Sequence, residues 1–534
     1  MQDAPLTIES ILRRGERYFP DKTIITKTVT GLERVTYAGL ATRIRRAAGI
    51  LESLNISEGA RVGTFGWNTA DHMAMYFAIP CTGRVLHTLN IRLFPDQLRY
   101  TVDHAEDEAV FVDRSLLPLF AQHLPGFSTV KHVVVFDDGS GNELPADPRV
   151  VRWDDVVGDE ADFTDKVTDE QTAAAMCYTT GTTGNPKGVL YSHRSTWLHS
   201  LIAQVPSTFA LQESDNVLPV VPMFHANAWG LPYAAMMAGA SLVMPGPDLA
   251  PASLLDLMES QRVTVTAGVP TIWMGMLPLL RGRDLSALRI VICGGSAVPR
   301  ALSEGWRKAI GLPITQAWGM TELSPLGTVC SMRSELDGLG EDDRADVRAT
   351  VGFPPTGVEI RIVEPETRQQ LPWDDKASGE LEVRGPWIAR QYYRTDNPGE
   401  QFSPDGWLRT GDVAAISKLG YVRLVDRTKD LIKSGGEWIS SVELENTIMS
   451  HPAVAEAAVI ALPHARWMER PFACVVLKPE ASLTKGELLD FLADQVDRWG
   501  LPDDIEFIDE IPKTSVGKFS KTTLRQRYAD RRLG

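Results

Sequence analysis

A loop rich in glycine and threonine is the clearest sign of chemistry in the sequence. Residues 178–188 read Tyr-Thr-Thr-Gly-Thr-Thr-Gly-Asn-Pro-Lys-Gly and follow a short apolar run at 173–177. Backbone N–H and hydroxyl groups at this density can surround phosphate oxygens, and a lysine adds positive charge. The loop is not a Walker loop, because Gly and not Ser or Thr follows the lysine. We therefore predict a phosphate site formed by Thr179, Thr180, Gly181, Thr182, Thr183, Gly184 and Lys187.

A second stretch offers groups suited to the rest of a nucleotide. Residues 317–322 read Ala-Trp-Gly-Met-Thr-Glu. The Trp318 ring can stack on adenine, Thr321 can reach a phosphate, and Glu322 offers a hard oxygen ligand for Mg²⁺. A buried aromatic residue at the end of a strand is the simpler explanation of Trp318 taken alone.

A glycine pair follows another apolar run. Residues 294–297 read Gly-Gly-Ser-Ala after the run at 288–293. Glycine lets a ligand approach the backbone closely. Val298 stands where a GxSxG hydrolase motif would need its second glycine, so this is not a nucleophile elbow. No HExxH, EF-hand loop or Rossmann GxGxxG is present either.

A histidine lies inside a long stretch without formal charge. Residues 216–247 contain no Asp, Glu, Lys or Arg and include His225. Prolines and polar groups interrupt the apolar runs, so we do not expect a membrane-spanning helix. We expect a buried interior with an apolar pocket that would suit an aliphatic tail. A single histidine in such a setting is otherwise most often an ordinary core residue.

Taken in order, these motifs resemble those of the adenylate-forming superfamily, which contains acyl-CoA synthetases, stand-alone adenylation domains and firefly-type luciferases. The resemblance runs from about residue 10 to residue 530 and adds motifs at 407–412, 426–438 and 512–518. Within the superfamily, the chain is similar to bacterial acyl-CoA synthetases for medium- to long-chain fatty acids. The family more often has Tyr or Phe in place of Trp318, a change that keeps the stacking face and removes a hydroxyl.

The resemblance implies a role for each motif. Lys518 is implied as a catalytic lysine that meets the carboxylate and the α-phosphate, and Lys429 as a hinge. His225 is implied beside the acyl carbonyl with Trp229 at the acyl tunnel, and Thr182 and Glu322 as Mg²⁺ ligands. The remaining ATP and AMP contacts implied are Gly294, Gly295, Ser296, Ala297, Gln316, Ala317, Trp318, Gly319, Met320, Thr321, Asp412, Arg427, Lys429 and Lys433, beside the phosphate loop. Among these, Asp412 is implied as the carboxylate that accepts the ribose hydroxyls. The coenzyme A tunnel is implied at Lys433, Gly435, Gly436 and Trp438.

The implied reaction uses ATP, Mg²⁺ and coenzyme A. A carboxylate attacks the α-phosphorus to give an acyl-adenylate and pyrophosphate, and coenzyme A then displaces AMP. A medium- to long-chain fatty acid is the expected substrate, and a short acid such as 3-(methylthio)propanoate is the alternative. Two other hypotheses are a stand-alone adenylation enzyme that loads a carrier protein and a nucleotide-binding protein without turnover.

The helices and strands that must position these motifs indicate an α/β fold. Strand-like runs at 109–112, 130–136, 263–267 and 288–293 alternate with helical patterns such as 252–262, which predicts layered αβα sheets. After about residue 340 the pattern favours a β-rich subdomain with strands at 351–363, 379–384 and 421–425. We predict an N-terminal domain at 1–426 and a small mobile α+β C-terminal domain at 427–534, with strands at 453–462 and 472–479 and a helix at 487–499.

The amino-acid composition narrows the class of protein further. The 534 residues are 43% hydrophobic and 23% charged, which is typical of a globular protein. A net charge of −15 gives no electrostatic footprint for nucleic acid or for an anionic membrane. Five separated cysteines without a CxxC pair, and an N-terminus without a signal peptide, indicate reduced thiols in a cytoplasmic enzyme. Related synthetases are often homodimers, and the resemblance implies the same state here.

Overall fold

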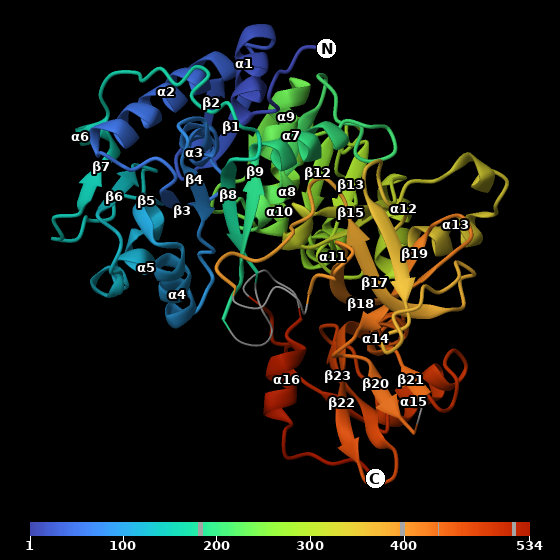
Figure 1. Ribbon diagram of the computed structural model, residues 1–534. Coiled ribbons are helices and arrows are strands. Elements are labelled where there is room, and N and C mark those ends of the chain that lie inside the picture. Colours follow the sequence, from blue (N-terminus) through green and yellow to red (C-terminus); the bar gives the residue numbers. More distant parts are fainter. Residues whose placement is uncertain (180–184, 396–400, 436, 515–518) are drawn as a thin grey trace.

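The computed structural model describes residues 1–179, 185–395, 401–435, 437–514 and 519–534, without the side chain of Glu437. Four sheets organise the chain, two large ones in the N-terminal part, a small antiparallel one, and one in the C-terminal part (Figure 1). The last part of the chain forms a smaller unit that contains the fourth sheet, is orange to red in Figure 1 and lies below the rest. We call it the C-terminal unit.

The first large sheet has the order β7-β6-β5-β3-β4-β8-β9. Its strands are parallel except for β9, which pairs antiparallel with β8. In β5, nearly every side chain is buried, as expected for a strand covered by helices on both faces. The strands are β3 (Arg61–Phe65), β4 (Val85–Thr88), β5 (Asp107–Asp113), β6 (His132–Phe136), β7 (Val150–Arg152), β8 (Ala173–Tyr178) and β9 (Gly188–Ser192).

The second large sheet has the order β15-β14-β13-β12-β10-β11-β1-β2. It is parallel from β14 to β1, and the two edge strands, β15 and β2, pair antiparallel. The strands are β1 (Thr23–Thr28), β2 (Gly31–Thr36), β10 (Asn216–Pro219), β11 (Ser241–Met244), β12 (Val265–Gly268), β13 (Ile290–Cys293), β14 (Ile314–Gly319) and β15 (Leu326–Val329).

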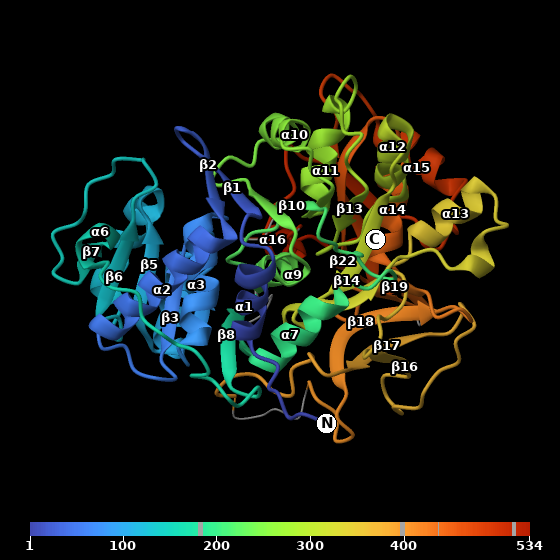
Figure 2. The same cartoon turned by 90° about the horizontal axis from the view of Figure 1, so that it is seen from above.

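Helices separate and cover these two sheets. One group packs together between them and shares its core with both sheets (Figure 2): α1 (Ile8–Tyr18), α2 (Tyr37–Ser53), α3 (Ala70–Cys81), α7 (His193–Ile202) and α9 (Leu231–Ala238). On the outer side of the first sheet lie α4 (Pro95–Ala105) and α5 (Leu117–Ala121). On the outer side of the second lie α10 (Pro251–Ser260), α11 (Pro270–Met276) and α12 (Arg300–Ile310). The prediction of layered αβα architecture is therefore confirmed.

Two smaller sheets complete the fold. The third is fully antiparallel in the order β16 (Glu359–Val363), β17 (Ser378–Arg384), β18 (Leu408–Ile416) and β19 (Val422–Arg427). The fourth contains β20 (Ile432–Ser434), β21 (Glu437–Ile439), β22 (Val454–His464), β23 (Met468–Leu477) and β24 (Asp504–Phe507). Its helices are α14 (Ser441–Met449), α15 (Lys485–Ala493) and α16 (Lys521–Arg527), and the short helices α6 (Trp153–Val156), α8 (Ala226–Trp229) and α13 (Glu341–Arg348) belong to the N-terminal part.

Most of the strands expected from the sequence are present within two residues of their predicted ends, but three predictions need correction. Residues 351–358 are not a strand, and only Glu359–Val363 of that run enters the third sheet. The helix predicted at 487–499 ends at Ala493, with Asp494 as its C-cap. The sequence analysis also named no strand at β18, because residues 409–412 are polar or glycine and leave only a short apolar run at 413–416.

The uncharged stretch 216–247 is interior, as predicted. Its residues form β10, α8, α9 and β11, and most of their side chains are buried. Within the described ranges, no helix is long and apolar enough to span a membrane. All five cysteines are buried free thiols.

The buried carboxylate of Asp215 and the partly exposed Arg289 link the amino-terminal ends of β10, β12 and β13 in the second sheet. The carboxylate of Asp215, whose side chain is 1% exposed, accepts hydrogen bonds from Arg289 Nε at 2.8 Å and from Thr264 Oγ1 at 2.7 Å. Arg289 also donates to the backbone oxygen of Ala210. Burial by itself would raise the pKa of Asp215, but the hydrogen bonds from Arg289 and Thr264 outweigh it and hold the pKa below its usual value.

We expect Asp215→Asn to lower the free energy of unfolding by about 3 kcal/mol at pH 7, because it leaves the Arg289 guanidinium without a counter-charge. A carboxyl with a depressed pKa stabilises the fold above its unfolded pKa, and this stabilisation is lost as the pH falls through the folded value. The difference in the free energy of unfolding between wild type and variant should therefore shrink below about pH 4. Urea unfolding followed by tryptophan fluorescence measures it.

The matched control is Asp256→Asn, which removes an exposed partner of Arg283. This variant should unfold at nearly the wild-type urea concentration at every pH. An Asp215→Asn variant that is as stable as the control at pH 7 would contradict the structural role given to the pair of Asp215 and Arg289.

Candidate active site

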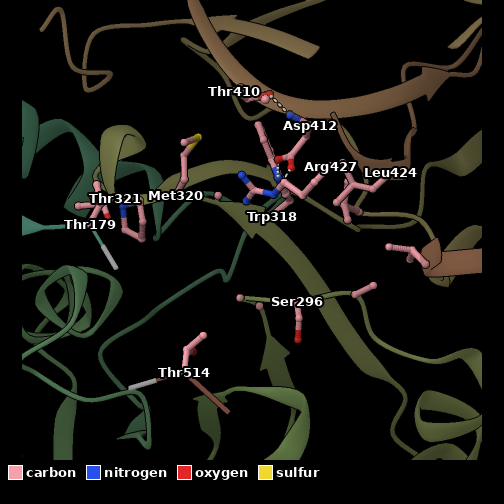
Figure 3. A pocket seen from close by; sticks show the side chains of 18 of the residues that line it. Thr179, Ser296, Trp318, Met320, Thr321, Thr410, Asp412, Leu424, Arg427 and Thr514 are labelled. Carbon is pink, nitrogen blue, oxygen red and sulfur yellow. Dashed lines mark hydrogen bonds and ion pairs between the residues drawn. The ribbon is translucent and has the colours of Figure 1, made fainter. Parts of the chain in front are cut away.

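A cavity of about 660 Å³ opens where the second large sheet, the third sheet and the C-terminal unit meet. We call it the central cavity. Its volume lies in the range of small-molecule and cofactor sites. Residues far apart in the sequence line it, from Thr179 to Thr522. Figure 3 shows this convergence, with Thr179, Ser296, Trp318, Asp412 and Thr514 around one space.

Most of the predicted site residues that the structure describes line the central cavity. They are Thr179, Lys187, His225, Trp229, Gly294, Gly295, Ser296, Ala297, Ala317, Trp318, Gly319, Met320, Thr321, Glu322, Asp412, Arg427 and Lys429. Predictions for Thr180, Gly181, Thr182, Thr183, Gly184, Gly436 and Lys518 fall outside the described residues.

Four predicted residues lie elsewhere. The Gln316 side chain is buried behind the wall, where its Oε1 accepts a hydrogen bond from the Val298 N–H at 2.6 Å. It therefore supports the loop after β13 without lining the cavity. Lys433, Gly435 and Trp438 lie on the surface of the C-terminal unit, with the Lys433 ammonium 4.8 Å from the centre of the Trp438 ring.

The nucleotide side of the cavity is built from the ends of two neighbouring parallel strands. The Gly294–Gly295 pair directly follows β13, and the 317–321 segment lies at the end of β14. Because β13 and β14 are parallel neighbours, their carboxyl ends meet at the same sheet edge. A Cβ atom on Gly294 would lie 3.0 Å from the backbone oxygen of Ala317, so any side chain here would crowd the neighbouring strand end.

A carboxylate and two donors form the polar centre of that side. The Asp412 side chain is 4% exposed; its Oδ1 lies 2.6 Å from Arg427 Nε. Its Oδ2 accepts a hydrogen bond from the Trp318 indole N–H at 2.8 Å. The dashed lines in Figure 3 join these side chains. Lys429 also lines the cavity, and burial lowers the pKa of its ammonium group.

Glu322 is suited to a hard cation that arrives with phosphate. Its side chain is buried, and its Oε1 accepts a hydrogen bond from the Tyr392 hydroxyl at 2.5 Å. Burial raises the pKa of Glu322, and the Tyr392 hydrogen bond opposes this rise. Within the described part of the chain no three His, Cys, Asp or Glu residues cluster as metal ligands. One carboxylate fits Mg²⁺, which commonly binds through one or two carboxylates together with substrate phosphates.

The loop lysine is held close to this carboxylate. Lys187 Nζ donates a hydrogen bond to Gln401 Oε1 at 2.9 Å and lies 4.7 Å from the centre of the Tyr392 ring. Tyr392 therefore contacts both the predicted phosphate-binding cation and the predicted metal ligand.

The apolar side of the cavity begins at His225. The next four residues, Ala226, Asn227, Ala228 and Trp229, all have positive φ angles, from 43° to 55°. Left-handed backbone costs non-glycine residues roughly 1–2 kcal/mol each, so the surrounding core must hold this turn in place. The turn directs the Trp229 ring toward the nucleotide side, where a Cβ on Gly294 would meet its Cη2 atom at 3.1 Å.

Several lining residues were missed by the sequence analysis. His199 and Phe209 lie on and after α7, and Pro270, Thr271 and Met274 lie on α11. No local motif marks them, because only the packing of the sheets brings them to the site. On α14, however, Val442, Glu445, Asn446 and Met449 share one helical face at i, i+3, i+4 and i+7, a spacing that the sequence does contain.

The C-terminal unit is anchored beside the cavity by a buried ionic cluster. Lys521 Nζ lies 2.7 Å from Glu445 Oε1 and donates a hydrogen bond to Ser441 Oγ at 2.6 Å. Ser441 in turn donates to Asp426 Oδ2 through its N–H and its hydroxyl, both at 2.6 Å. Asp426 belongs to β19, so the cluster ties α14 and α16 to the third sheet. Thr514 and Phe519, the described residues on either side of 515–518, both line the cavity.

Comparison with known proteins agrees with this architecture. The model of the AMP-binding enzyme family matches residues 12–393, and that of the AMP-binding enzyme C-terminal domain matches residues 443–518.

Relatives match along nearly the whole chain. A long-chain-fatty-acid–CoA ligase of Thermus thermophilus is 44% identical, over 99% of this chain and 96% of that protein. A medium-chain-fatty-acid–CoA ligase of Ectopseudomonas oleovorans is 41% identical, over 98% and 96%. A 3-methylmercaptopropionyl-CoA ligase of Ruegeria pomeroyi is 40% identical, over 99% and 98%.

Among solved structures, ATP-bound MatB from Rhodopseudomonas palustris aligns with a TM-score of 0.84 and 28% identity, over 98% of this chain and 99% of that one. The anthranilate CoA ligase AuaEII, in complex with anthranoyl-AMP, aligns with a TM-score of 0.86 and 25% identity, over 99% of both chains. The resemblance seen in the motifs is thus confirmed, and the chain belongs to the AMP-binding enzyme family.

Proposed function

We propose that the chain is an ATP-dependent, AMP-forming acid–thiol ligase that converts a medium- to long-chain fatty acid into its acyl-CoA thioester. The observation that carries this proposal is the contact between the two sides of the central cavity. The Trp229 ring, on the apolar side, lies against Gly294, on the nucleotide side. An acid in the apolar part would therefore present its carboxylate to the α-phosphate of a nucleotide bound beside Asp412.

In the first step, a carboxylate oxygen attacks the α-phosphorus, the bond to the β-phosphate oxygen breaks, and pyrophosphate leaves. Two anions must meet, so the barrier is largely electrostatic. Lys187 and Arg427 supply positive charge from the described cavity wall. Lys518 is proposed to add an ammonium group, since its neighbours Thr514 and Phe519 line the cavity. Mg²⁺ that enters with ATP would be held by Glu322 and Thr182 and would offset phosphate charge.

In the second step, the coenzyme A thiol loses its proton to solvent, its sulfur attacks the acyl carbonyl carbon, and AMP leaves with the bonding electrons. The C-terminal unit fills one side of the cavity, so coenzyme A needs this unit to move. We propose rotation about Lys429, which follows the last strand of the third sheet. Lys433, Gly435 and Trp438 would then turn from the surface toward the thiol; Trp438 is now 54% exposed. Such an exchange can limit turnover.

The acid is proposed from the lining and from the relatives. Phe209, Ala226, Trp229, Pro270 and Met274 make the acid side mainly apolar, which suits an aliphatic chain. Two of the relatives are named as ligases of long-chain and medium-chain fatty acids. The relative named for 3-methylmercaptopropionyl-CoA supports a short thioether acid as the second candidate. All of these relatives are named CoA ligases, which favours coenzyme A over a carrier protein.

The proposal also covers the domain boundary, the cellular compartment and the oligomeric state. We place the boundary between the two domains at 426/427, one residue before β19 of the third sheet ends and the chain leaves for the fourth sheet. Residues 340–426 would be the β-rich subdomain. We further propose a cytoplasmic homodimer; the five buried free thiols suit a reducing compartment.

Lys518→Ala should separate the two steps. We expect acyl-adenylate formation to fall by at least about 100-fold, because the variant lacks an ammonium group where negative charge develops. Thioester formation from supplied acyl-adenylate should stay close to wild type. Quench-flow measurement of each half-reaction tests this. The control is Lys485→Ala on α15, away from the cavity, which removes an exposed partner of Asp504 and should alter neither step. Equal loss of both steps in Lys518→Ala would contradict the assigned role.

The acid is identified by mass spectrometry of products from ATP, Mg²⁺ and coenzyme A with a panel of acids. The panel runs from propionate through 3-(methylthio)propanoate and octanoate to palmitate. We expect AMP and acyl-CoA in equal amounts, with the highest kcat/KM for an acid of octanoate length or longer, because the lining is mainly apolar. A maximum at 3-(methylthio)propanoate would overturn the fatty-acid assignment, and acyl-adenylate without thioester would overturn coenzyme A as the acceptor.

A further inference from the structure

The hydrogen bond between Trp318 and Asp412 joins two segments that the sequence places far apart. The indole N–H on β14 donates to Asp412 Oδ2 on β18 at 2.8 Å. Both side chains are almost fully buried, with 6% and 4% of their surfaces exposed. A hydrogen bond from a neutral donor to a buried carboxylate is stronger than one between two neutral groups.

The second oxygen of the carboxylate is held from the other side. Arg427 Nε lies 2.6 Å from Asp412 Oδ1, and the two residues are direct partners across β18 and β19. The Asp412 N–H donates to Thr410 Oγ1 at 3.1 Å, which fixes the backbone at the same point. A carboxylate whose two oxygens receive donors from different strands cannot rotate freely about its Cβ–Cγ bond. Figure 3 shows the three side chains in this arrangement.

The Trp318 indole in turn fits into the space beside a glycine of the neighbouring strand β15. A Cβ atom on Gly327 of β15 would lie 2.5 Å from Trp318 Cζ3 and 2.6 Å from Cε3. A Cβ atom this close to an aromatic ring is not tolerated, so the six-membered ring of Trp318 occupies the space that a side chain at position 327 would take. The chain thus provides room for the larger ring and fixes the direction of its N–H.

These observations lead to an inference that rests on the proposed function and extends it. We infer that Trp318 is a positioning residue: its N–H orients the Asp412 carboxylate for the ribose of ATP and sets the preference for ribonucleotides over deoxyribonucleotides. An ionised carboxylate has about four acceptor sites. Trp318 and Arg427 occupy one on each oxygen, and the remaining sites accept the 2′- and 3′-hydroxyls. Phenylalanine or tyrosine would keep an aromatic face but not this N–H.

The test compares ATP with 2′-deoxy-ATP and 3′-deoxy-ATP in steady-state AMP formation. For Trp318→Phe, we expect kcat/KM for ATP to fall about tenfold, the size expected when a hydrogen bond to a charged group is lost. With each deoxynucleotide the loss should be smaller, about threefold, because each keeps only one of the two hydroxyls that the oriented carboxylate binds. KM for the acid and for coenzyme A should stay unchanged.

Two further variants separate positioning from packing. Trp318→Phe combined with Gly327→Ala refills part of the space left by the smaller ring, provided that the end of the Leu323 side chain, 2.7 Å from the new Cβ, shifts. It should raise thermal stability above that of Trp318→Phe without restoring the preference for ATP. In an Asp412→Asn background, Trp318→Phe should cause no further loss with ATP, because the two side chains act as one unit.

The outcomes are distinct. Equal losses with ATP and with both deoxynucleotides, or recovery of ATP preference in the refilled variant, would overturn the inference and leave Trp318 as a packing residue. A wild-type enzyme that uses ATP and the deoxynucleotides equally well would also overturn it, while AMP formation would still support the proposed ligase. Absence of AMP with every acid would instead contradict the proposed function.

Discussion

The acid carboxylate and the triphosphate of ATP are both negatively charged and have to meet at one point. The way in which three units of the fold line one cavity follows from this constraint. A carboxylate approaches a triphosphate only where fixed donors and cations replace water. The structure assembles such a place from three separate units. Parallel strands β13 and β14 end at the same sheet edge and bring Gly294 and Trp318 together, the antiparallel third sheet adds Asp412 and Arg427, and the C-terminal unit closes the remaining side. None of these units could form the cavity alone.

Under the proposed mechanism, the position of the C-terminal unit bears on which of the two steps this conformation would serve. The buried cluster of Lys521, Glu445 and Asp426 holds α14 and α16 against the third sheet. In that position the segment that carries Lys518 is flanked by cavity-lining residues, whereas Trp438 faces solvent. This is the arrangement expected for adenylate formation under the proposed mechanism. Passage to the second step would have to open a buried ionic cluster, which gives the domain rotation a physical barrier.

The sequence alone was sufficient for the fold class and for the motifs on the nucleotide side, because glycine pairs and polar residues that follow apolar runs are local signals. It could not place residues that only tertiary packing brings together, such as His199 and Phe209. It assigned Gln316 to the nucleotide, but that side chain supports the adjoining loop. It interpreted Trp318 by its ring face alone, since the N–H contact with Asp412 depends on a strand 94 residues away and on the missing side chain of Gly327.

The central claim is that the acid's own oxygen attacks the α-phosphorus in this cavity. The most direct measurement uses a substrate acid labelled with ¹⁸O in both carboxylate oxygens, followed by mass spectrometry of all phosphorus-containing products. The account predicts that AMP gains a single ¹⁸O atom from the acid and that pyrophosphate gains none. Label in pyrophosphate or phosphate, or AMP without label, would contradict the account.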